Sequence, residues 1–289
     1  LIDTFENNID LYVKNESQIH PEFGGNKWRK LKYNLQNYFD RKHDHIVTFG
    51  GAFSNHIAAT AAVCHSLKIP CTGIIRGTYE DENNPTLLRA KSNGMSIHHI
   101  TKEAYKLKEH SQEFRSIIST FEKPLILPEG GSNDLAKKGV HEVIDEITDQ
   151  DFDNIILPSG TGMTTSGIIE QAPKTMHVIG VNVLKNKSLD EMVSSNLDNS
   201  DCSWEINHDY HFGGYAKVSD KLQSFAQEFY DKYDLVLDPI YNSKMMYGIL
   251  DMIKHGKFRD RSKLLAINTG GLQGVRGYEY VNKKIWVKT

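Results

Sequence analysis

Cysteine is scarce in this chain of 289 residues. Only Cys64, Cys71 and Cys202 occur, and their spacing makes neither a disulfide framework nor a metal-binding motif. Long apolar runs are also missing, because stretches such as Ile155-Ile156-Leu157 fall far short of the roughly 20 residues that cross a bilayer. The first residues lack the basic-then-apolar pattern of a signal peptide. The net charge of −3 provides no strong field for nucleic acid or an anionic membrane. These absences predict a cytoplasmic protein that binds no nucleic acid, no membrane and no metal.

Short β-rich runs alternate with amphipathic helical patterns along the chain. Strands are expected at residues 10–14, 45–49, 71–76, 96–99, 125–127, 154–157, 177–181 and 263–267. Helices are expected at residues 27–41, 54–66, 85–93, 102–121, 134–148, 164–171, 219–232 and 244–254. This alternation predicts an α/β protein whose parallel sheets are covered by helices. The polar segment 188–201 is typical of a surface loop or a frayed helix.

The turn-forming residues 128–133, Pro-Glu-Gly-Gly-Ser-Asn, divide these units into two groups. We expect residues 31–132 to form a small α/β domain. Residues 1–30 and 133–289 would together form a larger, discontinuous domain. A cleft between two such domains is a natural site for a small molecule.

A lysine stands where a helix is expected to begin, in Gly24-Gly25-Asn26-Lys27-Trp28-Arg29-Lys30. Cations are disfavoured at the positive end of a helix dipole. A crowded, partly desolvated amine beside Arg29 and Lys30 would have a lowered pKa and would be nucleophilic, as a Schiff-base lysine must be. A solvated basic turn is the alternative interpretation of this heptapeptide.

A glycine-rich loop, Ser159-Gly160-Thr161-Gly162-Met163-Thr164, follows a buried strand and precedes a helix. Backbone N–H groups at such a position suit a phosphate. The loop lacks the Gly-Lys-Ser/Thr of a Walker A motif, and Thr165 stands where the dinucleotide fingerprint has its third glycine. A single phosphate monoester is therefore favoured, with a plain tight turn carrying a Thr N-cap as the alternative.

A second glycine-rich turn, Gly50-Gly51-Ala52-Phe53-Ser54-Asn55-His56, also joins a strand to a helix. Its free N–H groups would hold a carboxylate, and Asn55 could bond a ring hydroxyl. Ser54 could instead be only an N-cap. Two further segments lie at strand or helix ends, where α/β proteins place functional groups: residues 238–244, Asp-Pro-Ile-Tyr-Asn-Ser-Lys, and residues 268–271, Asn-Thr-Gly-Gly.

Together these motifs resemble the pyridoxal-phosphate enzymes of the 1-aminocyclopropane-1-carboxylate deaminase / D-cysteine desulfhydrase family, which have the tryptophan-synthase-β-like fold. The match runs in order from Leu11-Tyr12-Val13-Lys14 to Thr269-Gly270-Gly271, nearly the whole chain. The resemblance implies two open, twisted, mainly parallel sheets flanked by helices, with pyridoxal 5'-phosphate in the interdomain cleft. It also implies a homodimer that acts on a small amino acid.

The same resemblance assigns roles to individual residues. Lys27 is the lysine bound to the cofactor, with Lys30 a competing amine that the Gly-Asn-Lys context disfavours. The loop Ser159, Gly160, Thr161, Gly162, Met163 and Thr164 holds the phosphate. Asn55 bonds the ring oxygen, and the segment Ser54, Asn55 and His56 receives the substrate carboxylate. The catalytic set is Lys27, Ser54, Tyr241 and Tyr215.

One position departs from the deaminase pattern. The deaminases carry a glutamate directly after the tyrosine of Asp-Pro-x-Tyr, and this chain has Asn242. A carboxylate against the pyridine nitrogen favours the protonated, electron-withdrawing ring, which neither Asn242 nor the hydroxyl of Thr269 can match. We therefore expect β-elimination, as in D-cysteine desulfhydrase, giving a 2-oxo acid and ammonia. Ring opening of 1-aminocyclopropane-1-carboxylate is the alternative, and a cofactor-binding protein with little turnover is a third interpretation.

Overall fold

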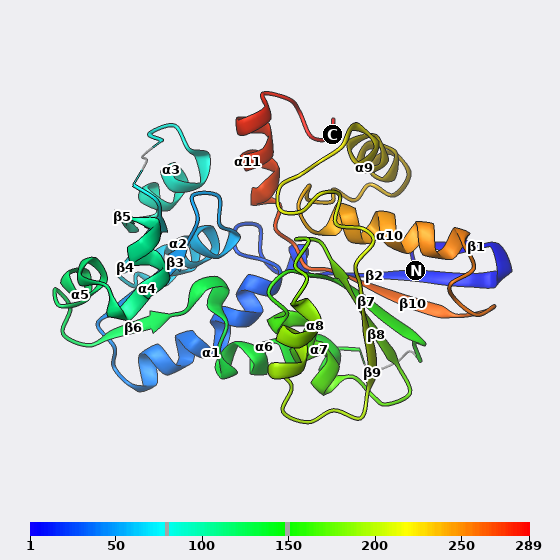
Figure 1. Ribbon diagram of the computed structural model, residues 1–289, viewed down its shortest axis with the longest axis horizontal. Coiled ribbons are helices and arrows are strands. Elements are labelled where there is room, and N and C mark those ends of the chain that lie inside the picture. The colour runs from blue at the N-terminus through cyan, green and yellow to red at the C-terminus, as the bar shows by residue number, and fades with distance from the viewer. Residues whose placement is uncertain (79–80, 148–150) are drawn as a thin grey trace.

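The computed structural model of the chain describes residues 1–78, 81–147 and 151–289. Two sheets form its framework, one in each of the two lobes seen side by side in Figure 1. The six-stranded sheet has the order β1-β2-β10-β7-β8-β9, and the four-stranded sheet has the order β5-β4-β3-β6. All neighbouring strands are parallel except β1 and β2. The strands are β1 (Asp3–Phe5), β2 (Ile9–Asn15), β3 (His45–Gly50), β4 (Cys71–Arg76), β5 (Ser96–Ile100), β6 (Pro124–Leu127), β7 (Asn154–Ser159), β8 (His177–Asn182), β9 (Ser203–Asn207) and β10 (Lys263–Asn268).

Helices cover both sheets, as parallel strands require. Short 3-10 turns occur at η1 (Glu6–Asn8), η2 (Glu16–Ile19), η3 (Lys108–His110) and η4 (Glu129–Gly131). The helices are α1 (Asn26–Asp40), α2 (Asn55–Leu67), α3 (Pro85–Ser92), α4 (Lys102–Leu107), α5 (Gln112–Ile118), α6 (Asp134–Asp145), α7 (Met163–Gln171), α8 (Leu189–Ser195), α9 (Asp220–Tyr233), α10 (Asn242–Lys254) and α11 (Gln273–Asn282).

The central strand β7 shows how the larger sheet is buried on both faces. Successive side chains of a strand point to opposite faces. Ile155 joins the apolar core under α6 and α7, while Ile156 joins the core under α9 and α10. The continuous apolar run that predicted this strand therefore serves two cores.

Helix α1 connects the two lobes. Its residues Leu31 and Leu35 pack into the core of the four-stranded sheet. The same helix lies directly against α6, and a Cβ added to Gly139 of α6 would lie 1.8 Å from the carbonyl oxygen of Arg29. This close backbone approach attaches the start of α1 to the larger lobe.

The eight predicted strands are all present, with bounds that agree to within two residues. The prediction of one helix over 102–121 is wrong: α4 and α5 are separated by η3, because Lys108 has a φ of 46° and Ser111 starts a new N-cap. The helix predicted over 134–148 ends at Asp145, and residue 148 lies outside the described residues.

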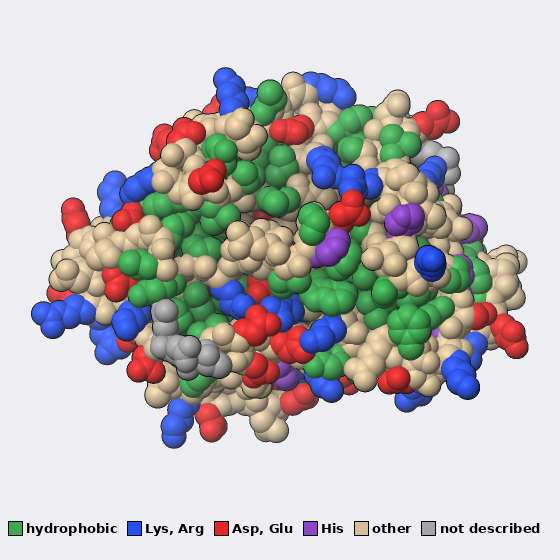
Figure 2. Space-filling model, turned by 180° about the vertical axis from the view of Figure 1, so that it is seen from behind, with side chains coloured by type: hydrophobic (Ala, Val, Ile, Leu, Met, Phe, Trp, Pro, Cys, Tyr) green, Lys and Arg blue, Asp and Glu red, His purple; other side chains and the backbone are tan. Residues whose placement is uncertain are grey.

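Among the strands and α-helices of the described residues, three have no counterpart in the sequence prediction. They are β1, only three residues long, β9 and α11, while α8 realises the helical alternative in the segment predicted as a loop or frayed helix. In the described residues, no helix combines the length and apolar character needed to cross a membrane. Acidic and basic side chains are interspersed over the face shown in Figure 2, in keeping with the small net charge.

Candidate active site

A cleft of about 420 Å³ opens at the carboxyl ends of β3, β4, β7 and β10, so both sheets contribute to it. Open parallel sheets generally place ligands at this end of their strands. Most of the predicted site residues line the cleft: Lys27, Ser54, Asn55, His56, Ser159, Gly160, Thr161, Gly162, Thr164, Tyr215, Tyr241 and Thr269. Met163 and Asn242 are buried and are not among the lining residues.

Lys27 enters the cleft because the backbone just before it packs against the end of β10. Gly25 is the N-cap of α1 with a φ of 90°, and the N–H of Asn26 donates to Thr269 O at 3.0 Å. Desolvation lowers the pKa of Lys27 to about 8. Burial and the charge of Lys27 also lower the pKa of Lys30, whose Nζ lies 3.5 Å from Gly130 O. Both amines line the cleft, and each has the lowered pKa that favours a nucleophile.

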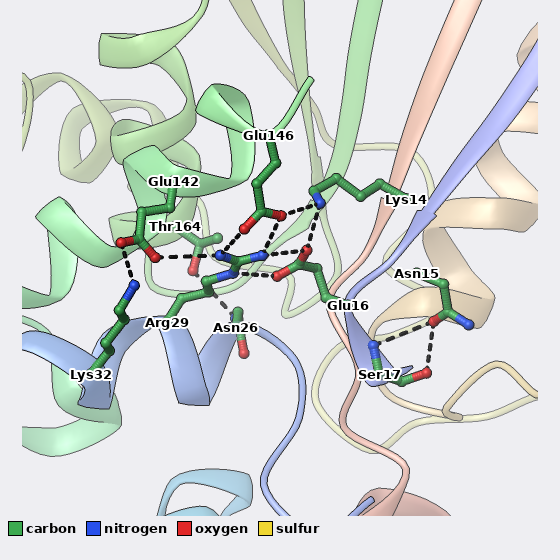
Figure 3. A network of polar contacts seen from close by, with 10 residues as sticks. All are labelled: Lys14, Asn15, Glu16, Ser17, Asn26, Arg29, Lys32, Glu142, Glu146 and Thr164. Atoms are coloured by element: carbon green, nitrogen blue, oxygen red, sulfur yellow. Dashed lines mark hydrogen bonds and ion pairs between the residues drawn. The ribbon is translucent and has the colours of Figure 1, made fainter. Parts of the chain in front are cut away.

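An ion-pair network surrounds Arg29 on the first turns of α1, two residues after Lys27 (Figure 3). Arg29, 5% exposed, donates from Nε to Glu16 at 2.7 Å and from Nη1 to Glu146 at 2.6 Å. Glu142 also contacts this guanidinium, at 3.4 Å. The Arg29 hydrogen bond is the main cause that lowers the pKa of Glu146, to about 2. Arg29 thus has a structural role behind the cleft and joins α1 to η2 and α6.

The loop between β7 and α7 has the geometry of an anion site. Gly162 is the N-cap of α7 with a φ of 83°, and no side chain caps the first N–H groups of the helix. The alternative of a Thr N-cap is therefore wrong. Asn26 Nδ2 donates to Thr164 Oγ1 at 3.3 Å, which connects this loop to the Lys27 turn. Uncapped N–H groups at a positive helix end fit a phosphate.

The amide of Asn55 has a fixed orientation. Gln273 Nε2 donates to the carbonyl oxygen of Phe53 at 2.9 Å and to Asn55 Oδ1 at 2.7 Å. A carbonyl only accepts, so the NH2 group of Gln273 must face both partners and the NH2 group of Asn55 must face away. Asn55 Nδ2 lies beside Gly271, where an added Cβ would be 2.8 Å away. Asn55 therefore presents a donor, as a ring oxygen requires.

Ser54 acts as an N-cap in this structure. Its Oγ accepts from the N–H groups of His56 at 3.2 Å and Ile57 at 3.3 Å, so the alternative role of Ser54 is realised. In the described part of the chain, the N–H groups of residues 52, 53 and 55 donate no hydrogen bond, and all three residues line the cleft. The ring of His56 is 1% exposed, and burial lowers its pKa. Its Nε2 lies 2.7 Å from Thr48 Oγ1.

The wall at the end of β10 presents Thr269 and hides Asn242. Asn242 is fully buried, and its Nδ2 donates to Asp238 Oδ2 at 2.5 Å and to Gly270 O at 2.7 Å. Its Oδ1 accepts from the N–H of Thr269 at 3.0 Å and from the hydroxyl at 3.4 Å. The Asp238 carboxylate is therefore separated from the cleft by an amide and a hydroxyl.

Two tyrosines complete the cleft. Burial raises the pKa of Tyr241, so its phenol keeps its proton at neutral pH. Tyr215, 51% exposed, follows Gly213 and Gly214, which both have positive φ. Its loop is anchored by Lys244, which is fully buried and whose Nζ donates to the carbonyl oxygens of Gly214, His211 and Val183 at 2.7, 3.0 and 3.2 Å.

Sequence reasoning missed four residues around the cleft: Arg76, Glu129, Lys244 and Gln273. Lys244 lies inside a motif that was singled out, and its carbonyl partners come from loops that no local pattern connects to it. Gln273 lies two residues beyond the Gly270-Gly271 pair, on a helix that was not predicted. Arg76 is the last residue of a predicted strand. This position could have indicated a functional side chain, because parallel sheets place ligands at the carboxyl ends of their strands.

Residues 3–270 match the family model described as pyridoxal-phosphate dependent enzyme. The bifunctional D-cysteine desulfhydrase/1-aminocyclopropane-1-carboxylate deaminase of Arabidopsis thaliana is 30% identical, over 93% of this chain and 74% of that protein. The D-cysteine desulfhydrase of Serratia proteamaculans is 26% identical, over 93% and 88%. A crystal structure of a homologue of 1-aminocyclopropane-1-carboxylate (ACC) deaminase has a TM-score of 0.78 and 25% identity, covering 96% of this chain and 89% of that one.

The residues of the cleft fit the cofactor of this family on physical grounds. An uncapped helix N-terminus suits its phosphate, a lysine with a lowered pKa suits its aldehyde, and an oriented amide donor suits its ring oxygen. The fold is the expected α/β arrangement of two mainly parallel sheets. The chain therefore belongs to the pyridoxal-phosphate dependent enzymes, within the 1-aminocyclopropane-1-carboxylate deaminase / D-cysteine desulfhydrase family.

Proposed function

We propose that this enzyme catalyses β-elimination on a small amino acid, as D-cysteine desulfhydrase does, and releases a 2-oxo acid and ammonia. One observation carries the proposal: the wall at the end of β10 offers the Thr269 hydroxyl, while the Asp238 carboxylate is enclosed behind Asn242. A neutral partner leaves the pyridine ring a weaker electron acceptor than a carboxylate would. Expulsion of a good leaving group from the β-carbon needs less electron withdrawal by the ring than ring opening of 1-aminocyclopropane-1-carboxylate, which breaks a C–C bond in a substrate that has no α-proton to remove.

The bound pyridoxal phosphate would supply an electron-withdrawing ring that stabilises negative charge at the substrate α-carbon. Lys27 would bind the cofactor aldehyde and, once released, take the α-proton at Nζ, since its pKa of about 8 suits a base near neutral pH. The loop Ser159–Thr164 would hold the phosphate, and Asn55 Nδ2 would orient the ring oxygen. Met163 would contribute only its backbone, because its side chain is buried outside the cleft.

The remaining cleft residues would position the amino acid. The N–H groups of residues 52, 53 and 55 would bind the α-carboxylate, with Ser54 and His56 shaping this turn. Tyr241 would donate a hydrogen bond from a phenol that stays protonated, and Tyr215 would lie near Tyr241 in the same cleft. Thr269 would face the pyridine nitrogen, and Asn242 would orient the Thr269 hydroxyl.

The test is a comparison of products. Holoenzyme is incubated with D- and L-cysteine, 3-chloroalanine and 1-aminocyclopropane-1-carboxylate, and pyruvate and 2-oxobutanoate are quantified separately. We expect pyruvate from a three-carbon substrate to form faster than 2-oxobutanoate. Faster release of 2-oxobutanoate would establish ring opening instead. Cofactor bound without turnover of any substrate would leave only a binding protein.

The assignment of the cofactor lysine needs its own experiment. Wild-type protein and the Lys27→Ala and Lys30→Ala variants are loaded with pyridoxal phosphate, reduced with borohydride and digested. We expect a cofactor mass adduct on the Lys27 peptide of the wild type and of Lys30→Ala, and none in Lys27→Ala. An adduct on Lys30 in the wild type would overturn the assignment.

We also propose the domain division 1–30 plus 133–289 and 31–132, with the cleft between the two parts. A homodimer in the cytoplasm is proposed as the working form. Support for a reducing compartment comes from the three cysteines, which are all free and buried. Sedimentation of the holoenzyme as a monomer would contradict the dimer.

A further inference from the structure

Arg76 is a charged residue of the cleft in the smaller lobe. It ends β4, next to the strand that leads into the Gly51 turn, and it lines the cleft. A Cβ added to Gly51 would lie 4.0 Å from Arg76 Nη2. Apart from the chain neighbours of Gly51, no other atom of the described residues would lie within 4 Å of it. The guanidinium therefore borders open space. Its carbon lies 5.9 Å from the centre of the Tyr105 ring, within the range of a cation–π contact.

Arg76 has no direct partner of opposite charge in the parts of the chain that the structure describes. Within residues 1–78, 81–147 and 151–289, it has no ion pair and no hydrogen bond. Glu129 also lines the cleft, but its carboxylate lies 4.0 Å from Lys108 Nζ. Burial lowers the pKa of both Lys27 and Lys30, whereas a guanidinium stays protonated. Among the described residues that line the cleft, Arg76 supplies the guanidinium.

The proposed anions of cofactor and substrate already have binding groups elsewhere. The phosphate would lie at the N-terminus of α7, in the larger lobe, and the α-carboxylate at the N–H groups of residues 52, 53 and 55. Arg76 belongs to the smaller lobe and faces the space above Gly51, at the edge of that carboxylate turn. A third anion, carried by the side chain of the substrate, would meet this guanidinium.

We propose that Arg76 determines specificity by binding a second anionic group, on the side chain of the amino acid that enters the cleft. The substrate class is then an α-amino acid whose β-carbon carries a sulfonate or a phosphate ester, which can leave as sulfite or phosphate when the bond to the β-carbon breaks. A carboxylate on the β-carbon cannot leave in this way and serves only as a binding probe. This inference rests on the proposed function, namely that the cleft takes an amino acid. Arg76 forms a bidentate pair with such a group, and Glu129 opposes it by like charge.

The test compares aspartate with asparagine, which have nearly the same shape and differ in charge. Holoenzyme is titrated with both enantiomers of each, and binding is followed by the change in cofactor absorbance, which needs no turnover. The variants are Arg76→Gln, Arg76→Lys and Glu129→Gln. Arg115→Gln, an arginine of α5 outside the cleft, is the matched control.

We expect the wild type to bind aspartate more tightly than asparagine. Arg76→Gln should weaken aspartate by roughly 10- to 100-fold, as the loss of a charge-assisted pair implies, and change asparagine less than twofold. Arg76→Lys should restore part of the preference, Glu129→Gln should increase it, and Arg115→Gln should leave it unchanged. The aspartate affinity of the wild type should fall as salt is raised.

Two results would overturn the inference. Equal weakening of aspartate and asparagine in Arg76→Gln would place the arginine at the α-carboxylate or in the scaffold. Unchanged binding of both would make it a solvated surface group. The same preparations are assayed for pyruvate from 3-chloroalanine. A preference for aspartate without any pyruvate would refute the elimination reaction and leave the role of Arg76 standing.

Discussion

Gly25 is the residue that allows Lys27 to approach the end of β10, and its replacement by alanine should be severe. Its φ of 90° and ψ of −168° lie in a region that only glycine occupies readily, with a strain of about 1–3 kcal/mol for other residues. An added Cβ would lie 2.3 Å from Thr269 O and 3.1 Å from Gly270 Cα. Both are backbone atoms, so relief requires movement of the chain, at about 1–3 kcal/mol. The sum is a loss of about 2–6 kcal/mol.

Gly94→Ala is the matched control, because Gly94 has a φ of 83° and open space where its Cβ would be. It should lose only the strain of the backbone conformation, about 1–2 kcal/mol. Urea denaturation of the two apoproteins and of the wild type measures the free energy of unfolding. We expect Gly25→Ala to be the less stable variant by at least about 1 kcal/mol. It should also capture pyridoxal phosphate more slowly than Gly94→Ala does, since the clash displaces Asn26 and Lys27 from Thr269.

Equal losses of stability in the two variants would refute the reasoning, because the contact of Gly25 with Thr269 would then add nothing to the backbone strain. Wild-type stability of Gly25→Ala would refute it completely. A Gly25→Ala protein that is unfolded without urea, beside a folded Gly94→Ala, would agree with the upper end of the expected loss.

Four further predictions concern titrating and buried groups. Apoprotein should capture pyridoxal phosphate covalently at a rate that rises with pH, because only the free amine of Lys27 attacks the aldehyde. The rate should reach half its maximum near the lowered Lys27 pKa of about 8. A midpoint near the ordinary lysine pKa of 10.5 would contradict the assignment. Arg29→Met removes both Arg29 hydrogen bonds from the buried Glu16 carboxylate, whose remaining ion pair is with Lys14 Nζ at 3.2 Å, and should cost up to about 3–5 kcal/mol in urea unfolding at pH 7. Because the pKa of Glu146 in the folded state is lowered, to about 2, its pairing with Arg29 stabilises the wild type above pH 4.5, and this stabilisation is lost as the pH falls towards 2. If the free energy of unfolding of Arg29→Met fell with pH as steeply as that of the wild type, this prediction would be wrong. Lys244→Met frees three carbonyl oxygens and should speed proteolysis at residues 211–217, and an unchanged cleavage rate would show that the Tyr215 loop does not depend on it.

The order of strands, helices and glycine-rich turns could be predicted from the sequence because these signals are local. The apolar run of β7 and the glycines after it predicted a buried strand and a loop at a helix start, and the structure has both. The order of such motifs along the chain was also enough to identify the family and its cofactor. The single helix expected over 102–121 failed because the apolar period continues across residues whose backbone turns away at Lys108.

The placement of side chains was decided only by the tertiary structure. Gln273 orients Asn55 from 218 positions away, and Lys244 anchors the Tyr215 loop through carbonyl groups of two other segments. Asn242 and Thr269, equal candidates in the sequence, are separated because one is enclosed by Asp238 and Gly270 while the other reaches the cleft. Backbone preference depends on neighbouring residues, whereas burial, charge and the direction of an amide depend on groups that the fold brings together from distant parts of the chain.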